Sequence, residues 1–224
     1  MNHFKISNPK TNRHEKINPT QFVAGTLLLL TSFNLHAQES HIAVLLNMVN
    51  SKLNYGTLNK SLNDYRKDVR GLQAGLSWQA SVSNRFSVVS EAYFIRKGGR
   101  LQSGNPLTDV GSTLKLYSVE VPVLARVHAG RWYFNAGPYT SYILSGKSIT
   151  PEATRKISFA ENGNGYKRWE AGVQAGAGFQ FRIKRARMAV DVRYSHGLSS
   201  ISRYTDIYNR TLNVSIVAFK PLKK

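Results

Sequence analysis

The stretch YSVEVPVLARVHAGRWYFNAGPYTSYIL, residues 117–144, decides the fold. In its first half, apolar side chains at odd-numbered positions alternate with a second face that carries Glu120 and Arg126. Alternation with a period of two indicates a β-strand whose two faces meet different surroundings. The short segment 128–131 indicates a tight turn, after which a second strand begins. The stretch therefore predicts an antiparallel hairpin with charges on one face and valines on the other.

The same alternation recurs along the chain. Residues 71–82 (GLQAGLSWQASV) and 168–183 (RWEAGVQAGAGFQFRI) place large apolar side chains on one face, and glycine, glutamine, serine and charged residues on the other. Beyond the N-terminal segment, no stretch shows a sustained helical period. The sequence therefore predicts an all-β protein.

The lengths of the predicted strands and connections distinguish a membrane barrel from a soluble sheet, since alternation suits both. Long and tight connections alternate, and most strands reach the roughly 9 to 11 residues that a tilted membrane strand needs. We therefore predict an up-and-down, eight-stranded antiparallel transmembrane β-barrel with all long loops at one end. The predicted strands are 41–50, 70–82, 85–97, 114–128, 132–144, 168–183, 187–196 and 210–219.

Aromatic residues fall near the predicted strand ends on the apolar face, as in the interfacial girdles of membrane barrels. Those near the tight turns are Phe86, Trp132, Phe134 and Phe181, and those near the long loops are Tyr117, Tyr142, Trp169 and Tyr194. Aromatic residues also favour strands in general, so the pattern supports a barrel without requiring it.

The N-terminus predicts export. Basic residues precede the apolar run 22–33, and the small residue Ala37 follows it, which is typical of a signal peptide. The run is shorter than a spanning helix needs, so an uncleaved anchor is the weaker interpretation. We predict a signal peptide at 1–37 and an outer-membrane barrel domain at 38–224.

The chain is strongly basic, with 31 Lys and Arg against 12 Asp and Glu and a formal charge of +19. Such a charge predicts an anionic partner. For an exported protein, chromosomal DNA is excluded in practice, so we expect no nucleic acid partner. The chain has no cysteine, and neither a disulfide nor a cysteine-based zinc site is available.

The polar face of the predicted strands points into the barrel, whose interior at eight strands is only about wide enough for side chains to fill. By parity this face collects four acidic and four basic residues, which we expect to pair across the lumen: Glu91, Glu120, Arg126, Arg168, Glu170, Arg182, Asp191 and Arg193. Glycines 172, 176 and 178 share this face and leave room for the arginines. Pro122 and Pro138 are expected at bulges, or where no backbone N–H is needed.

Signals for catalysis are weak. Ser195 and His196 are adjacent on a predicted strand, so they point to opposite faces and cannot act as a nucleophile and its base. His41, His128 and His196 lack ligand spacing for a metal and are expected at the rims. We therefore expect no metal, no cofactor and no enzymatic activity.

Five segments together resemble the PorT-like outer-membrane β-barrel family of Bacteroidota: 85–99 (RFSVVSEAYFIRKGG), 114–127 (LKLYSVEVPVLARV), 133–144 (YFNAGPYTSYIL), 176–181 (GAGFQF) and 190–201 (VDVRYSHGLSSI). The family's recurring steps are matched by Glu91, by Tyr117, Glu120 and Pro122, by Gly137 to Tyr139, and by Arg193 to Leu198. The resemblance extends from about residue 71 to 219. It implies the barrel fold, the outer membrane and a link to secretion, since PorT is associated with type IX secretion.

These observations predict an integral outer-membrane protein with a structural, binding or assembly role. A lipid-A-modifying enzyme and a small-solute channel are the alternatives. Expected partners are outer-membrane lipid and lipopolysaccharide, the barrel-assembly machinery, and secretion or envelope proteins. A basic rim facing lipopolysaccharide phosphates is expected at Arg66, Lys67, Arg70, Lys97, Arg100 and Lys167.

Overall fold

The computed structural model describes residues 40–160, 165–183 and 186–221. Eight long strands make up most of this part: β1 (Ser40–Asn54), β3 (Val69–Ser81), β4 (Phe86–Leu101), β5 (Ser112–Ala129), β6 (Trp132–Ile149), β8 (Trp169–Ile183), β9 (Ala186–Gly197) and β10 (Tyr208–Pro221). The loops contain the short elements η1 (Gly56–Asn59), β2 (Arg66–Lys67) and β7 (Thr154–Lys156).

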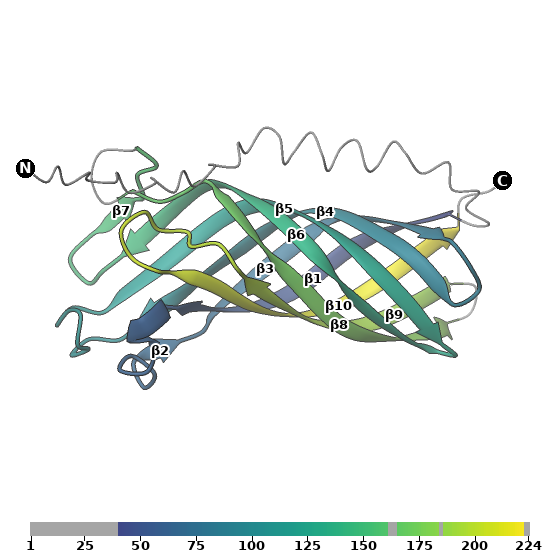
Figure 1. The fold of residues 1–224 in the computed structure, drawn as a ribbon, viewed down its shortest axis with the longest axis horizontal. Coiled ribbons are helices and arrows are strands. Elements are labelled where there is room, and N and C mark those ends of the chain that lie inside the picture. Colours follow the sequence, from purple (N-terminus) through teal and green to yellow (C-terminus); the bar gives the residue numbers. More distant parts are fainter. Residues whose placement is uncertain (1–39, 161–164, 184–185, 222–224) are drawn as a thin grey trace, which may run out of the picture. The chain divides into compact units, whose positions relative to one another are not determined.

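The eight long strands form a closed antiparallel barrel (Figure 1). Each pairs with its neighbour in sequence, and β1 closes the sheet by pairing with β10 from His41↔Pro221 to Asn54↔Tyr208. Closure leaves no long strand with an unpaired edge, as a barrel in lipid requires. The predicted fold class is confirmed.

The connections differ at the two ends of the barrel. At one end, which we call the short-turn end, the turns at 82–85 and 130–131 are short, and only two residues separate the end of β8 from the start of β9. The described loop residues 55–68, 102–111, 150–160, 165–168 and 198–207 form the long-loop end, where β2 pairs with β4 and β7 pairs with β6. The strands also run further at this end than predicted. For example, β4 reaches residue 101 rather than 97, and β6 reaches 149 rather than 144.

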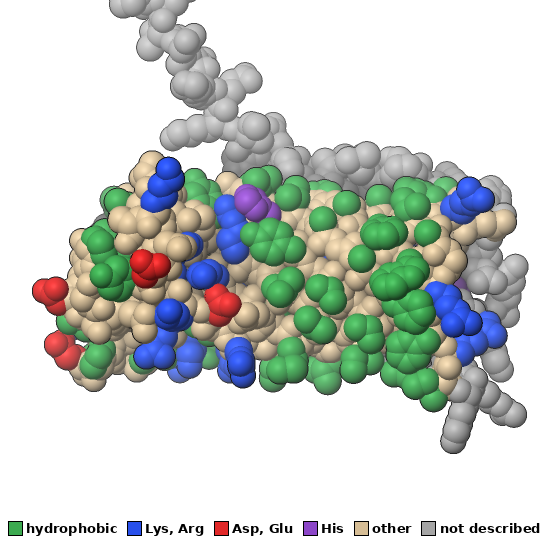
Figure 2. Space-filling view, turned by 90° about the horizontal axis from the view of Figure 1, so that it is seen from below, with side chains coloured by type: hydrophobic (Ala, Val, Ile, Leu, Met, Phe, Trp, Pro, Cys, Tyr) green, Lys and Arg blue, Asp and Glu red, His purple; other side chains and the backbone are tan. Residues whose placement is uncertain are grey.

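The outer wall carries an apolar band. On β1 the outward side chains of Ile42, Val44, Leu46 and Met48 are 40–66% exposed although all four are apolar, and the other long strands continue the band. Its members include Ile42, Val44, Leu46, Met48, Leu72, Leu76, Phe94, Val119, Val121, Phe134, Leu144, Val173, Val190, Val192, Leu212, Val214 and Ile216. Figure 2 shows this band in green, with Lys and Arg gathered on either side of it. A belt of this kind matches the lipid-facing surface of a membrane barrel.

Several of the predicted girdle aromatics lie on this outer wall. Trp132 and Phe134 are both 54% exposed near the short-turn end, and Trp169 is 47% exposed toward the long loops. Trp132 packs edge-on against Phe179, with ring centroids 5.0 Å apart, and Trp169 packs against Tyr142 at 4.9 Å. Aromatic rings of this kind are enriched at the boundary between lipid and water.

The two prolines lie where the ladder of paired residues is interrupted. The β4–β5 ladder pairs Ser90↔Val123 and resumes at Tyr93↔Glu120, so Pro122 lies in the gap. Pro138 lies in the corresponding gap of the β5–β6 ladder, and the register is the same on both sides of each gap. The prolines therefore occupy positions whose missing N–H costs little. The bulge is elsewhere, between Tyr117 and Ser118.

An apolar cluster fills the barrel at the long-loop end. We call it the apolar plug, formed by Leu53, Leu114, Leu116, Ile143 and Ile201. Ile201 enters from the loop 198–207, which is anchored by a hydrogen bond from the Ile201 N–H to the Ile207 carbonyl (2.8 Å).

Two tyrosines from the loops pack on the plug, Tyr55 and Tyr166. Burial, with a smaller contribution from the neighbouring Tyr166, raises the pKa of Tyr55 to about 12. Burial also raises the pKa of Tyr166. Both tyrosines are half-buried, so these loop residues cover part of the plug.

The predicted signal peptide, 1–37, lies outside the described residues. In the part that the structure does describe, no helix is long and apolar enough to cross a membrane.

Candidate functional site

The barrel interior is the candidate functional site, because it buries most of the charged residues predicted for it. Six of those eight residues are at most 6% exposed: Glu91, Glu120, Arg126, Glu170, Asp191 and Arg193. They come from β4, β5, β8 and β9, and their inward direction follows from the two-residue alternation of each strand. We call these residues and their polar partners the interior network.

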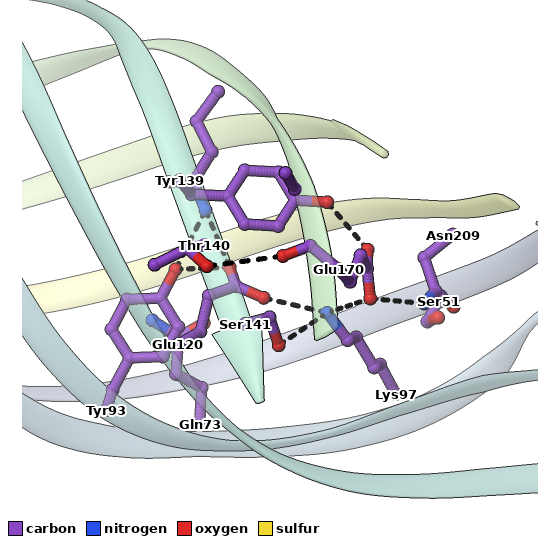
Figure 3. A network of polar contacts seen from close by, with 12 residues as sticks. Ser51, Gln73, Tyr93, Lys97, Glu120, Tyr139, Thr140, Ser141, Glu170 and Asn209 are labelled. Carbon is purple, nitrogen blue, oxygen red and sulfur yellow. Dashed lines mark hydrogen bonds and ion pairs between the residues drawn. The ribbon is translucent and has the colours of Figure 1, made fainter. Parts of the chain in front are cut away.

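Lys97 is the centre of one half of this network, although the sequence predicted it on the rim. Its side chain is 1% exposed, with Nζ 2.8 Å from Glu120 Oε2 and 2.9 Å from Glu170 Oε2 (Figure 3). Nζ also donates a hydrogen bond to Ser141 Oγ at 3.3 Å. The rim prediction for Lys97 was wrong because β4 continues four residues beyond the predicted end. On the longer strand, Lys97 shares the inward parity of Glu91.

Neutral side chains donate further hydrogen bonds to the two carboxylates. Glu120 Oε1 accepts from Tyr93 OH and from Gln174 Nε2, both at 2.7 Å. Glu170 Oε1 accepts from Tyr139 OH at 2.7 Å, and its Oε2 accepts from Asn209 Nδ2 at 2.7 Å (Figure 3). Charged groups can be buried when such partners replace the water they lose.

Arg193 is the centre of the other half. Its guanidinium donates to both oxygens of Glu91, at 2.6 and 3.2 Å, and lies 3.5 Å from Asp191 Oδ1. A bidentate contact of this kind fixes both distance and orientation. Gln174 lies 3.5 Å from the same guanidinium and also bonds Glu120, so it links the two halves.

Arg126 extends the network toward the short-turn end. Its Nε donates to Asn135 Oδ1 at 2.7 Å, and one terminal nitrogen donates to Gln79 Oε1 at 2.7 Å. Asn135 in turn donates to Asp191 Oδ2 at 3.0 Å. The guanidinium also stacks over the Tyr133 ring, 4.1 Å from its centroid. Arg126 therefore reaches its acidic partner through an amide rather than directly.

Two of the predicted interior arginines are not in the interior. Arg168 is exposed one residue before β8 begins. It donates to the carbonyls of Ile143 and Leu144 at 3.2 and 3.3 Å and lies over the Phe159 ring. Arg182 is exposed near the end of β8. These predictions were wrong because the alternation of side chains assigns a residue to the interior only where the barrel surrounds that part of the strand.

The interior therefore holds four buried carboxylates and three buried cations among the described residues. The sequence predicted four carboxylates and four cations in the interior. The structure has four carboxylates and three cations there, and Lys97 is shared between two of the carboxylates. The missed signal was available in the sequence, because residues 91, 93, 95 and 97 have the same parity.

The glycines of β8 make room for large interior side chains, as predicted, but mainly for tyrosines. A Cβ on Gly172 would collide with the Tyr139 ring, and one on Gly178 would collide with the Tyr133 ring. Gly176 lies against Arg193. Tyr139 can reach Glu170 only because β8 has no side chain at 172.

The wall formed by β1, β3, β9 and β10 is more weakly paired. Asn47 Oδ1, Gln73 Nε2, Ser195 Oγ and Asn213 Oδ1 are buried without a partner among the described residues. Buried polar atoms of this kind generally bind internal water. Asn213 Nδ2 does donate to Gln73 Oε1, at 3.1 Å.

Elsewhere, the described residues offer little for catalysis or metal binding. Ser195 is 4% exposed and points into the barrel, whereas His196 is directed to the outer wall near Tyr194. Within residues 40–160, 165–183 and 186–221, no group of three or more His, Asp or Glu could hold a metal ion.

The remaining rim residues lie at the long-loop end. Lys67, Arg70, Arg100 and Lys167 are exposed there, and Arg66 is half-buried. Arg66 donates to the Leu53 carbonyl at 3.2 Å and to Asn63 Oδ1 at 2.9 Å, so it helps to hold its own loop. The prediction omitted Arg96 and Lys115, which face outward just beyond the apolar band.

Comparisons with known proteins identify a family and several similar structures. A family model described as "Outer membrane protein beta-barrel domain" matches residues 36–203. The attachment invasion locus protein Ail of Yersinia pestis is 13% identical, with 81% of this chain and 99% of Ail covered and a TM-score of 0.44. OprG from Pseudomonas aeruginosa is 11% identical, with 82% and 94% covered and a TM-score of 0.46. Neisserial surface protein A is 9% identical, with 79% and 95% covered and a TM-score of 0.46.

No curated protein matches the sequence. The family model covers three quarters of the chain, and the closed barrel with its apolar band is the structure that this description names. The chain belongs to the outer membrane protein beta-barrel domain family and resides in the outer membrane.

Proposed function

We propose that this protein is a non-conducting outer-membrane barrel with a structural, binding or assembly role. The observation that carries the proposal is the filled interior. The side chain of Lys97, from β4, contacts Glu120 of the neighbouring β5 and reaches across the lumen to Glu170 of β8, which is not a neighbour of β4. Above it lies the apolar plug. Ion-conductance recording of the purified barrel tests the proposal, because an open water-filled pore would contradict it.

A lipid-A-modifying enzyme is the second candidate. Such an enzyme needs a nucleophile or base that reaches the lipid-facing surface or the loops. The opposite directions of Ser195 and His196 support a non-enzymatic role, as does the use of all four buried carboxylates in hydrogen bonds or ion pairs. Incubating the purified protein with lipid A and weighing the product by mass spectrometry tests this: a mass change would favour the enzyme.

The finer identity proposed is a PorT-like barrel of Bacteroidota, with secretion or envelope proteins as partners and the barrel-assembly machinery as the route of insertion. The segments that resemble this family include the interior residues Glu91, Glu120 and Arg193, which supports a shared core. The secretion role rests on the resemblance. It predicts that deleting the gene in its host reduces export of cargo across the outer membrane, and normal export would contradict it.

We further propose that the long-loop end faces the cell exterior and its basic rim faces lipopolysaccharide. Single cysteines at Ser61 and Thr108, both exposed in long loops, should react on intact cells with a membrane-impermeant maleimide. A cysteine at Asn84, exposed in a short turn, should react only after the cells are opened. The chain has no native cysteine, so the background is clean. Labelling of Asn84→Cys alone on intact cells would reverse the orientation.

A further inference from the structure

Three lysines stand directly opposite one another on neighbouring strands at the long-loop end. Lys115 of β5 is paired with Lys147 of β6, and Lys147 is paired with Lys156 of β7. We call these three residues the lysine column. Directly paired side chains have Cβ atoms about 4.5–5.5 Å apart, and like charges at that spacing destabilise a sheet.

A bulge places the middle lysine on the outer wall. On β6, Ser141 and Ile143 point inward, but Leu144 and Ser145 are both exposed and Gly146 is buried. The register with β5 shifts by one residue at this point, between Tyr117 and Ser118. With the alternation unbroken, residue 147 would share the inward face of residue 143. The bulge instead turns Lys147 outward, beside Lys115.

The lysine column has no acidic partner among the described residues. Lys147 and Lys156 are exposed and Lys115 is half-buried. The ion pairs of the described residues involve Lys52, Lys97 and Arg193 instead. The next outward cations are Arg96 and Arg100 on β4, which are paired with Tyr117 and Thr113 on either side of Lys115. Mutual repulsion is therefore not compensated within the described protein.

The column lies at the border of the apolar band. On the outer face of β5, going toward the long-loop end, the exposed Val119 is followed by the half-buried Tyr117 and then by Lys115. Two residues of strand rise about 7 Å, so the amino groups reach the level of lipid headgroups when the valines lie in hydrocarbon. Phosphate is the anion found at this level.

We propose that the lysine column binds a phosphate group of an outer-leaflet glycolipid. The inference rests on the proposed orientation of the barrel. A phosphate between adjacent lysines would accept charge-assisted hydrogen bonds from more than one ammonium group and remove the repulsion between them. The ligand class is a phosphorylated lipid rather than a free anion, because the apolar band beside the column offers a surface for the acyl chains.

Binding of lipid A to the purified barrel, measured by native mass spectrometry, tests the site. The double substitution Lys147→Gln with Lys156→Gln should weaken binding on the order of tenfold to thirtyfold, since each surface cation contributes a modest attraction to an anionic lipid. The matched control is Lys52→Gln with Lys60→Gln, which removes the same charge from β1 and its loop. It should change binding less than about twofold. Equal losses in the two variants would overturn the proposal.

Further arms distinguish the source of the phosphate and the role of the lysines. Dephosphorylated lipid A should bind the wild type no more tightly than it binds the double variant. If inorganic phosphate competes for the site as effectively as lipid A does, the site is a simple anion site and not the proposed lipid site. In neutral detergent at low salt, Lys147→Gln should not lower the melting temperature, because it relieves repulsion, and a decrease would identify a structural lysine instead. If cysteine labelling reverses the orientation while lipid A still binds here, the orientation fails and the site stands.

Discussion

Replacing Lys97 with methionine is expected to lower the free energy of unfolding by about 3–5 kcal/mol, as breaking a buried ion pair does. Methionine has a similar length and no charge, so the change removes the cation and little volume. Glu120 and Glu170, each within 2.9 Å of Nζ, would then face each other without a counter-charge. Their side chains are at most 2% exposed, so water cannot replace the lysine without rearrangement.

The measurement is urea unfolding in phospholipid vesicles, followed by tryptophan fluorescence. The control is Lys52→Met, which breaks an exposed pair with Asp68 at 3.8 Å and should cost less than about 1 kcal/mol. Adding Glu120→Gln to Lys97→Met should restore part of the loss, since it removes one uncompensated charge. A Lys97 variant as stable as its control would mean that the interior ion pairs contribute nothing to the fold.

Replacing Arg193 with methionine is expected to lower the free energy of unfolding by a similar amount, about 3–5 kcal/mol. The guanidinium holds Glu91 through two hydrogen bonds and lies 3.5 Å from Asp191, so its removal exposes two buried carboxylates to each other. It also removes the contact with Gln174, which connects the two halves of the interior network.

Arg182→Met is the matched control for this prediction. Arg182 was assigned to the same interior set by parity, but it is exposed at the end of β8. Its replacement should change the free energy of unfolding by less than about 1 kcal/mol. Equal effects of the two substitutions would support the arrangement expected from the sequence and contradict the one observed.

The alternation of side chains predicted the barrel and most of its interior. Glu120 lies in the middle of β5 and Arg126 nearer its end, but the sheet surrounds both of them, and the alternation along the strand decides which way they point. Closure and the order of the strands followed from the alternation of long and tight connections. These features depend on local pattern and on chain length, and both can be read from the sequence.

The errors gathered near the strand ends. Lys97 was placed on the rim because the predicted strand ended there, although the strand continues and its parity is that of Glu91. Arg168 precedes β8 and Arg182 lies at its open end, so neither is enclosed. The bulge at Tyr117 and Ser118 turns Lys147 outward. Such a bulge depends on the partner strand, and the side-chain pattern of β6 alone does not predict it.

Planar-bilayer recording of the purified, refolded protein tests the central claim most directly. With the interior network crossing the lumen and the apolar plug above it, the wild type should add no steady conductance to that of the bare bilayer. Insertion must be verified in the same preparation by the heat-sensitive mobility of a closed barrel on SDS gels. Long-lived ohmic steps from the inserted wild-type protein would contradict a filled interior and make the protein a channel.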